Sequence, residues 1–415
     1  MGGDELPRSR RALNALALGV ALLAPRAVHS ATSFIPIPEI ITDPNEGNTG
    51  GLLGVVLFLD EKDEIRYMLA PDVRYNRTKG VFPTFRFFAY PTPQRRWSVL
   101  VGKSTTKDED YELEFSDRGY WEGRAFVRAA FVHERDSTDR FFGFGNDTRS
   151  EATRLPERGP FGGETNYTGR NTEAQATPGV WLLPSVNLSY RMRIRRFDVE
   201  PGQVRHVAFI GSRYPQAFAR ANDPGVYWAH QAALTYDSRD SFDIPTHGAL
   251  ALGYLEMADR RLGSPTSFVK FGGEWRDFIP LRKGNPILAL HVLADYTSGD
   301  LRTPFWEQSS LGGRRTLRGF GSDRFIDFNR SLGATELRTR VWQRKMFGVN
   351  AELELAPFLE AGQVFRRVTD SPVSDLHVVY GLGFRGVVRP QIVGFVDVGR
   401  GNEGTAIFTG IDYPF

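Results

Sequence analysis

The chain contains 415 residues, 24% of them charged, with no cysteine and a formal net charge of +3. A helical membrane protein needs spanning segments of about 20 apolar residues, and the longest uncharged apolar stretch after residue 30 runs only from Leu52 to Leu59. These values exclude a helical membrane protein and disulfide bonds, but they fit both a soluble domain and a closed β-barrel with a polar lumen.

The N-terminus has the three-part pattern of a secretory signal peptide. A basic head precedes an apolar core, residues 12–24, and Val28 and Ser30 suit the positions before a cleavage site. The basic residues of the head are Arg8, Arg10 and Arg11. We expect a signal peptide over residues 1–30 and a short periplasmic leader over residues 31–50. Without the signal the chain is close to neutral, which gives no reason to expect a nucleic-acid partner.

Period-2 alternation recurs from residue 51 to the C-terminus. In residues 186–195, Leu188, Tyr190 and Met192 alternate with polar side chains that include three arginines. Residues 288–296 and 351–362 repeat the pattern. An apolar face toward lipid and a polar face toward the lumen are typical of strands in an outer-membrane barrel. The sequence therefore predicts an all-β fold, a transmembrane antiparallel β-barrel over residues 51–415 that contacts outer-membrane lipid in the bacterial cell outer membrane.

About seventeen candidate strands, separated by turns rich in Gly, Pro, Asn and Asp, fill this region. Because no convincing amphipathic helix lies between them, a fold with crossover helices is excluded. A long irregular stretch, residues 299–330, interrupts the series. The five strands expected after it are residues 331–343, 348–363, 374–388, 391–400 and 404–415.

The last predicted strand ends on an aromatic residue. Its alternating positions are Ile407, Thr409, Ile411, Tyr413 and Phe415. Soluble domains rarely stop in this way, because their termini are usually frayed and polar. The pattern resembles the C-terminus of bacterial outer-membrane barrels, whose assembly machinery reads the terminal strand. The resemblance implies that Tyr413 and Phe415 form an assembly signal and that the barrel-assembly machinery is a partner during biogenesis.

The irregular stretch 299–330 is too long for a plain turn, and such loops are usually functional. It contains Leu317-Arg318-Gly319-Phe320. This tip resembles the sixth-loop signature of the superfamily of the barrel-assembly insertase, the translocation-and-assembly module and the two-partner-secretion transporters, the bacterial surface antigen type of outer-membrane protein. The resemblance implies a barrel of sixteen strands, five of them after the loop, and a sixth extracellular loop that folds inward.

Three further segments support the resemblance, which covers residues 140–415. Phe358 to Gly362 is similar to the family's aromatic-x-Asp-x-Gly element, with Glu360 in place of the aspartate that pairs with the loop arginine. Residues 236–240, with Pro245 and Gly248, resemble a strand-end element of the family. Residues 142–147 resemble a motif of its short members.

The parity of the strands gives Arg318 a partner without reference to the family. Glu360 falls on the lumen parity of its strand, and Glu336, Arg338 and Arg340 fall on the lumen parity of the strand after the loop. A guanidinium binds a carboxylate bidentately, and glycine at 319 allows a tight backbone turn. We therefore predict that the loop enters the lumen and is held there by Arg318 and Glu360, as a plug and brace.

Sequence patterns of enzymes are missing. The seven histidines are scattered without metal-ligand spacing, and neither His-Glu-x-x-His nor Gly-x-Ser-x-Gly occurs. We expect no metal, no cofactor and no catalytic residue. His291 and Asp295 share a strand face and could pair with a serine, as in a barrel-embedded lipid hydrolase, which is a distant third hypothesis.

Two functional hypotheses remain. The first is a pore of the protein insertase or translocation kind, with weakly paired first and last strands, a loop that controls the lumen and unidentified client proteins. The second is a passive porin or structural outer-membrane barrel. The family's large members carry periplasmic domains of about 75 residues that receive substrate chains, and residues 31–50 are too few for one. The Leu317–Phe320 tip and Glu360 favour the first hypothesis, because a generic porin does not need that pairing.

Overall fold

The computed structural model describes residues 32–61, 65–147, 164–222, 225–300, 302–346, 349–389, 392–411 and 413–415. The expected signal peptide, residues 1–30, lies outside this part of the chain. No helix in the described residues is long and apolar enough to cross a membrane.

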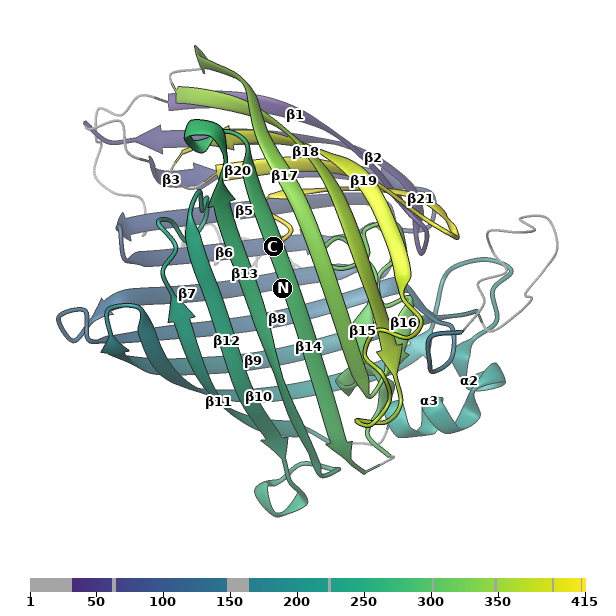
Figure 1. Cartoon of the computed structure of the whole chain (residues 1–415). Helices are drawn as coiled ribbons and strands as arrows, with labels where there is room; N and C mark the ends of the chain where they lie inside the picture. The colour runs from purple at the N-terminus through teal and green to yellow at the C-terminus, as the bar shows by residue number, and fades with distance from the viewer. Residues whose placement is uncertain are drawn as a thin grey trace, which may run out of the picture.

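One antiparallel sheet closes on itself into a barrel (Figure 1). Its strands are β1 (Thr32–Asp43), β2 (Gly47–Leu59), β3 (Ile65–Leu69), β4 (Asp72–Asn76), β5 (Gly80–Thr92), β6 (Arg95–Lys103), β7 (Glu109–Tyr120), β8 (Ala125–Phe141), β9 (Thr165–Leu183), β10 (Val186–Pro201), β11 (Tyr227–Asp237), β12 (Gly248–Ala258), β13 (Phe268–Pro280), β14 (Ile287–Gly299), β17 (Asn329–Met346), β18 (Val349–Phe365), β19 (His377–Val388), β20 (Ile392–Gly401) and β21 (Gly404–Ile411). The closing contact joins β1 to β21.

β3 and β4 are two halves of one barrel strand. Both pair with β2 on one side and with β5 on the other. The interruption falls at Ala70 and Pro71, and proline has no N–H to donate to a ladder. The barrel therefore has eighteen strands, and the sequence-based expectation of sixteen is wrong.

The first strand, β1, begins before the predicted barrel and corrects the expected leader over residues 31–50. Thr32–Asp43 pairs with β2 along its whole length, from Thr32 opposite Phe58 to Asp43 opposite Gly47. This strand contains two prolines, Pro36 and Pro38. Proline is tolerated on a strand edge that needs no N–H donor, and the other edge of β1 is in register with β21 only at Thr42 and Ile407.

The connections at the two ends of the barrel differ in length. One end carries the long connections 142–164, 202–226 and 300–328, whereas the other carries short turns and the hairpin 238–247. Outer-membrane barrels place long loops outside the cell and short turns in the periplasm, so the first end is called the outer end here. Counted from β1, the connection after β14 is the seventh at the outer end. This connection was expected to be the sixth, and its number differs because the barrel has eighteen strands instead of sixteen.

Short helices lie in the connections. They are α2 (Ile210–Arg213), α3 (Pro215–Ala221), and the 3-10 turns η1 (Arg260–Leu262), η2 (Arg282–Gly284) and η3 (Phe305–Glu307). The strands β15 (Ser309–Leu311) and β16 (Phe325–Asp327) form a separate hairpin within the connection after β14. Figure 1 shows α2, α3, β15 and β16 together at the outer end.

The alternation predicted from sequence separates lipid from lumen. On β10, Leu188 and Tyr190 face outward and are 45% and 46% exposed, whereas Arg193 faces inward and is 8% exposed. On β18, Leu359 is exposed and Glu360 is buried. Five strands follow the connection after β14, close to the predicted boundaries. Period-2 alternation therefore identifies the strands of the barrel wall, because each strand faces lipid on one side and the lumen on the other.

Candidate functional site at the inner loop

The connection between β14 and β17 folds into the lumen. Its residues 302–328, called the inner loop here, include η3, β15 and β16. Four of its apolar side chains are at most 1% exposed and pack against Leu332, Phe358, Val364 and Val379 of the wall. These side chains are Leu311, Leu317, Phe320 and Phe325. A loop with such burial serves as the packing core of this part of the lumen.

Arg318, at the tip of the inner loop, is fully buried and is held by three carboxylates of the wall. Its Nε donates to Glu360 Oε1 at 2.8 Å, and its backbone N–H donates to Glu360 Oε2 at 2.6 Å. Its Nη1 lies 3.0 Å from Glu336 Oε2 and 2.6 Å from Asp397 Oδ2. The structure thus brings together Arg318, Glu360 and Glu336, which the sequence selects, and adds Asp397 of β20.

Two further arginines balance the charge of this cluster. Arg338 Nε donates to Glu336 Oε1 at 3.0 Å. Arg385 Nη2 donates to Glu336 Oε2 at 3.1 Å, and Arg385 Nη1 also donates to Asp397. All six side chains are at most 1% exposed, so this group of three arginines and three carboxylates is named the arginine cluster. Burial alone would lower the pKa of Arg318, but Glu360, Glu336 and Asp397 raise it above its ordinary value.

Glycine at the loop tip permits contact between backbones. A Cβ on Gly319 would lie 2.5 Å from the backbone N of Gly401, and a Cβ on Gly399 would lie 2.2 Å from Arg318 O. The turn itself is made at Leu317, whose φ is 48°. The role of Gly319 is therefore close approach to β20, and the turn expected there lies two residues earlier.

Aromatic rings surround the tip. The Arg318 guanidinium lies 3.6 Å from the centroid of the Phe358 ring. Phe320 packs edge-to-face on Phe325 at 5.1 Å and on His377 at 5.7 Å. The residues of the predicted 142–147 motif cover this part of the loop: Gly145 N–H donates to Ile326 O.

Arg340, expected to face the lumen with Glu336 and Arg338, has a side chain that is 42% exposed.

A second anchor holds the start of the inner loop. Glu307 accepts hydrogen bonds from both terminal nitrogens of Arg193, each at 2.7 Å, and its backbone O accepts from Lys270 Nζ at 3.1 Å. Burial alone would raise the pKa of Glu307, but Arg193 and Arg195 outweigh burial and lower it to about 2. The inward arginines of β10 were visible in the sequence, whereas their loop partner was not.

The C-terminal tail, residues 413–415, also enters the lumen. β21 ends at Ile411, and Phe415 is 5% exposed in a pocket with Phe278, Ile287, Ala289 and Ala334. Arg338 Nη2 donates to Phe415 O at 3.0 Å. Figure 1 shows the C-terminus within the outline of the barrel. This corrects the expectation of a strand through residue 415, because the tail instead contacts side chains of β13, β14, β17 and β18 inside the lumen.

The hairpin 238–247 closes the same end of the lumen. Ile244 packs with Val387, Val393 and Tyr413. On the opposite side of the lumen, Arg96 of β6 forms an ion pair of 3.2 Å with Asp243. The predicted strand-end element lies here, where Asp237 and Arg239 pair at 2.9 Å. The inner loop at one end and this hairpin with the C-terminal tail at the other therefore both occupy the lumen.

The contacts of His291 and Asp295 do not support the hydrolase hypothesis. His291 Nε2 lies 2.9 Å from Glu274 Oε1, and its ring stacks on Phe415. Asp295 instead accepts from Arg330 Nε at 2.5 Å and from Tyr254. Within the described ranges, no group of three or more His, Cys, Asp or Glu side chains could hold a metal ion.

Comparison with known proteins identifies the family. Residues 95–385 match the Omp85 superfamily domain. The chain belongs to the Omp85 superfamily. Its fold resembles that of BamA from Haemophilus ducreyi lacking POTRA domains 1–3, with a TM-score of 0.52 and 12% identity over 99% of this chain and 79% of that one. CdiB from Escherichia coli gives a TM-score of 0.49 and 12% identity over 94% of this chain and 62% of that one.

A search of curated proteins found no match. Family and fold together establish an Omp85 β-barrel of the bacterial outer membrane. The resemblance read from the Leu317–Phe320 tip and from Glu360 is thus confirmed at the level of the superfamily.

Proposed function

We propose that this Omp85 barrel is a gated pore of the insertase or translocation kind. The observation that carries the proposal is the arginine cluster, in which the loop residue Arg318 meets carboxylates from three wall strands, β17, β18 and β20. A guanidinium buried with hydrogen-bonded carboxylates costs roughly 3–5 kcal/mol to unpair by removing one partner. Such an anchor gives the loop a defined inward position that can be kept or lost as a unit.

The seam between β1 and β21 supports the same function. These strands are in register only at Thr42 and Ile407, whereas β20 and β21 pair from Gly394 opposite Ile411 to Gly401 opposite Gly404. In lipid, unpaired backbone groups are costly, so the seam is the part of the wall that opens at the lowest cost. A passive porin has use for neither an occupied lumen nor a weak seam.

Conductance tests the gating part of the proposal. The mature chain is reconstituted in planar bilayers as wild type, as Arg318→Ala, and as Arg302→Ala, a loop arginine whose side chain is 63% exposed. We expect low conductance for wild type and Arg302→Ala, and larger, noisier conductance for Arg318→Ala. If all three proteins conduct equally and resist protease equally, the inner loop does not gate the lumen.

Client assembly tests the insertase part. Since the chain has no cysteine, Thr42→Cys with Ile407→Cys places one disulfide across the seam, and Val396→Cys with Thr409→Cys places a control disulfide between β20 and β21, where these residues are partners. We expect the wild type to accelerate the insertion of an unfolded client barrel into liposomes. The oxidised seam variant should lose this activity, and the oxidised control should keep it. No acceleration by the wild type would leave the passive porin as the better hypothesis.

A further inference from the structure

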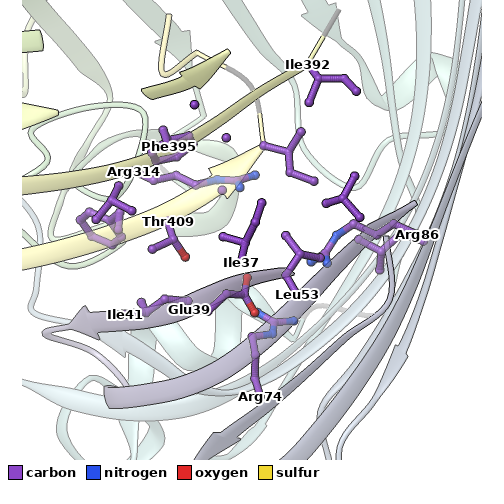
Figure 2. Close-up of a pocket in the computed structure, with 18 of the residues that line it drawn as sticks. Ile37, Glu39, Ile41, Leu53, Arg74, Arg86, Arg314, Ile392, Phe395 and Thr409 are labelled. Atoms are coloured by element: carbon purple, nitrogen blue, oxygen red, sulfur yellow. The ribbon is translucent and has the colours of Figure 1, made fainter. Parts of the chain in front are cut away.

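The lumen contains a cavity of about 1220 Å³ beside the seam. Side chains of β1, β2 and β3 line one side of it, and β7 and β8 line the other. Arg314 of the inner loop also lines it, near Phe395 and Thr409 (Figure 2). Cavities of about 300–1,000 Å³ bury most of a drug-sized ligand, so this one has room for a molecule with a chain and a headgroup.

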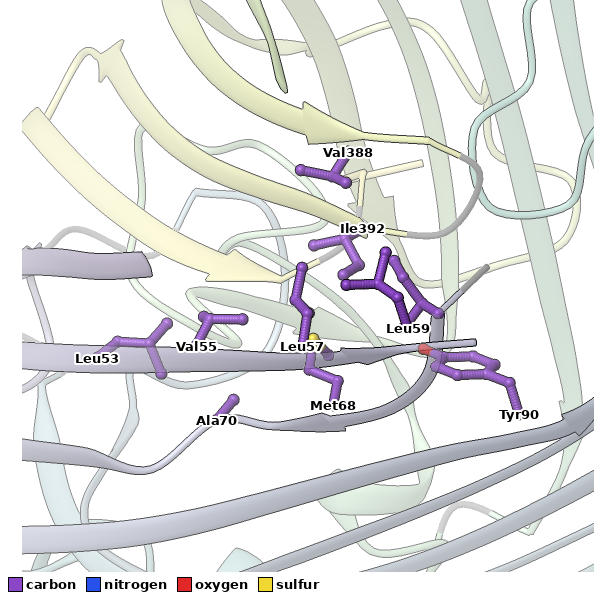
Figure 3. Packing of buried hydrophobic residues seen from close by; sticks show 10 residues of the cluster. Leu53, Val55, Leu57, Leu59, Met68, Ala70, Tyr90, Val388 and Ile392 are labelled. Atoms are coloured by element: carbon purple, nitrogen blue, oxygen red, sulfur yellow. The ribbon is translucent and has the colours of Figure 1, made fainter. Parts of the chain in front are cut away.

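The side of the cavity next to the seam is apolar. The lumen face of an outer-membrane barrel is normally polar, but here the inward side chains of β1 and β2 are Ile35, Ile37, Ile41, Leu53, Val55 and Leu57. Leu53, Val55 and Leu57 belong to a cluster that also contains Met68, and Val388 of β19 and Ile392 of β20 join this cluster from the other side of the seam (Figure 3). The outward neighbours Ile40 and Leu52 are also apolar, at 66% and 57% exposed. Near the seam, both faces of the wall therefore suit hydrocarbon.

The side opposite is acidic. Asp110, Glu112 and Glu114 of β7 and Glu134 of β8 face the cavity, and carboxylates outnumber cationic side chains among the residues that line it. Arg74 of β4 and Arg86 of β5 line the cavity near Glu39 (Figure 2), and both already form ion pairs with Asp72. An anionic ligand would thus meet more repulsion than attraction, whereas a cationic group would meet complementary charge.

One carboxylate interrupts the apolar side. Glu39 of β1 lies between Ile37 and Ile41 and is 9% exposed. Its Oε2 is buried and has no hydrogen-bond donor among the residues that the structure describes. A buried carboxylate oxygen without a donor is costly, and this one lines the cavity. It also lies three residues from Thr42, along the part of β1 that has no register with β21.

We propose that this cavity binds an amphiphile with an alkyl chain and an ammonium-bearing headgroup. The chain lies along Ile37, Leu53 and Val55, and the ammonium donates to Glu39 and faces the acidic side. The unregistered part of the seam is the entry route, because it joins the apolar side of the cavity to the bilayer. The site does not depend on whether the barrel moves a client, so it stands or falls separately from the gated-pore proposal.

Binding is measured on the purified full-length protein in a neutral maltoside detergent, by native mass spectrometry and calorimetry. The probes share a twelve-carbon chain and differ in headgroup: dodecylammonium, dodecylphosphoethanolamine, dodecanol and dodecanoate. We expect the two ammonium-bearing probes to bind more tightly than dodecanol, and dodecanoate to bind most weakly. Tighter binding of dodecanoate, or equal binding of all four probes, overturns the proposal.

Two matched pairs of variants distinguish the contribution of the headgroup charge to binding from that of the alkyl chain. Glu39→Gln should weaken the ammonium-bearing probes about tenfold, as expected for a lost charge-assisted hydrogen bond, and leave dodecanol unchanged. Its control is Asp117→Asn, a buried carboxylate of β7 outside the cavity. Leu53→Asn should weaken every probe, whereas Leu52→Asn, on the outward face of the same strand, should not.

Heat-modifiable mobility verifies that each variant is folded. Equal affinities of folded Glu39→Gln and Asp117→Asn for dodecylammonium would overturn the assignment of Glu39. An ethanolamine phospholipid that copurifies with wild type and is reduced in Glu39→Gln identifies the bilayer as the source. Binding of added probes without such a lipid supports the same chemistry and identifies a free amphiphile.

Discussion

Arg338 joins the end of the chain to the arginine cluster. Its Nη2 donates to the backbone O of Phe415, and its Nε donates to Glu336, each at 3.0 Å. Glu336 in turn accepts from Arg318 of the inner loop at 3.0 Å. The inner loop and the C-terminal tail are therefore connected through Glu336 of β17, which Arg318 binds directly and Phe415 reaches through Arg338. Because the partners of a shared charge are coupled, a change at one is expected to be felt at the other.

Loss of the loop arginine is expected to destabilise the barrel. Arg318→Ala leaves Glu360 and Asp397 buried with one partner fewer, at a cost of about 3–5 kcal/mol. The transition in urea should move to lower concentration, and the inner loop should become sensitive to protease. Arg318→Lys should recover only part of the loss, because a lysine cannot bridge three carboxylates as a guanidinium does. An unchanged urea midpoint for Arg318→Ala would contradict the burial of the pair.

Glycine at 319 is expected to resist substitution. The Cβ of Gly319→Ala would meet backbone atoms of Gly401 and Arg400 at 2.5 and 2.8 Å, and overpacking of this kind costs about 1–3 kcal/mol. Gly333→Ala is the matched control, because a Cβ there has no heavy atom within 4 Å. Thermal and urea unfolding of the two variants should differ by that amount. Equal stability would mean that the loop tip does not touch β20.

The C-terminal ring is expected to hold the inner end of the lumen closed. Phe415→Ala removes the ring that stacks on His291 at 5.0 Å and fills a pocket with Phe278 and Ile287. Conductance should rise, and stability should fall by up to about 3–5 kcal/mol. Refolding from urea into detergent keeps this measurement independent of cellular assembly. Phe34→Ala, at a side chain that is 56% exposed, should change neither property.

Acid is expected to release the second anchor. The pKa of Glu307 is lowered to about 2 from an ordinary value of 4.5, so its ion pair with Arg193 stabilises the fold fully above pH 4.5. This stabilisation is lost as the pH falls from about 4.5 toward 2. The adjacent Trp306 reports the change, and its fluorescence in wild type should shift in that window. In Glu307→Gln the shift should vanish; a shift that persists would assign it to another group.

The sequence alone could predict the wall and the loop tip, but not how far each residue reaches into the lumen. Parity puts Glu336, Arg338 and Glu360 on the lumen face, and the resemblance selects Arg318 as their partner. Asp397 and Arg385 also have lumen parity, yet parity does not give the height of a residue along the barrel axis. That height depends on the register of β19 and β20, which a single strand does not encode.

The errors at the two ends of the chain have one physical cause. Pro36 and Pro38 suggest a leader, and the alternation that continues to Phe415 suggests a strand. In both cases the outcome depends on partners remote in sequence. β1 is a strand because β2 pairs with it, and the tail leaves the wall because Arg338 and Glu354 bind it inside, the latter through Tyr413 Oη at 2.8 Å. Local pattern reports which conformations a segment can adopt, and distant contacts choose among them.

The inward tail has a consequence for biogenesis. Phe415, one of the two residues expected to be read by the assembly machinery, is accessible only while the chain is unfolded, because folding places it inside its own lumen at 5% exposure. If Tyr413 and Phe415 form the expected assembly signal, a finished barrel conceals part of that signal. That expectation predicts that release from the assembly machinery needs no separate signal, because folding itself buries Phe415.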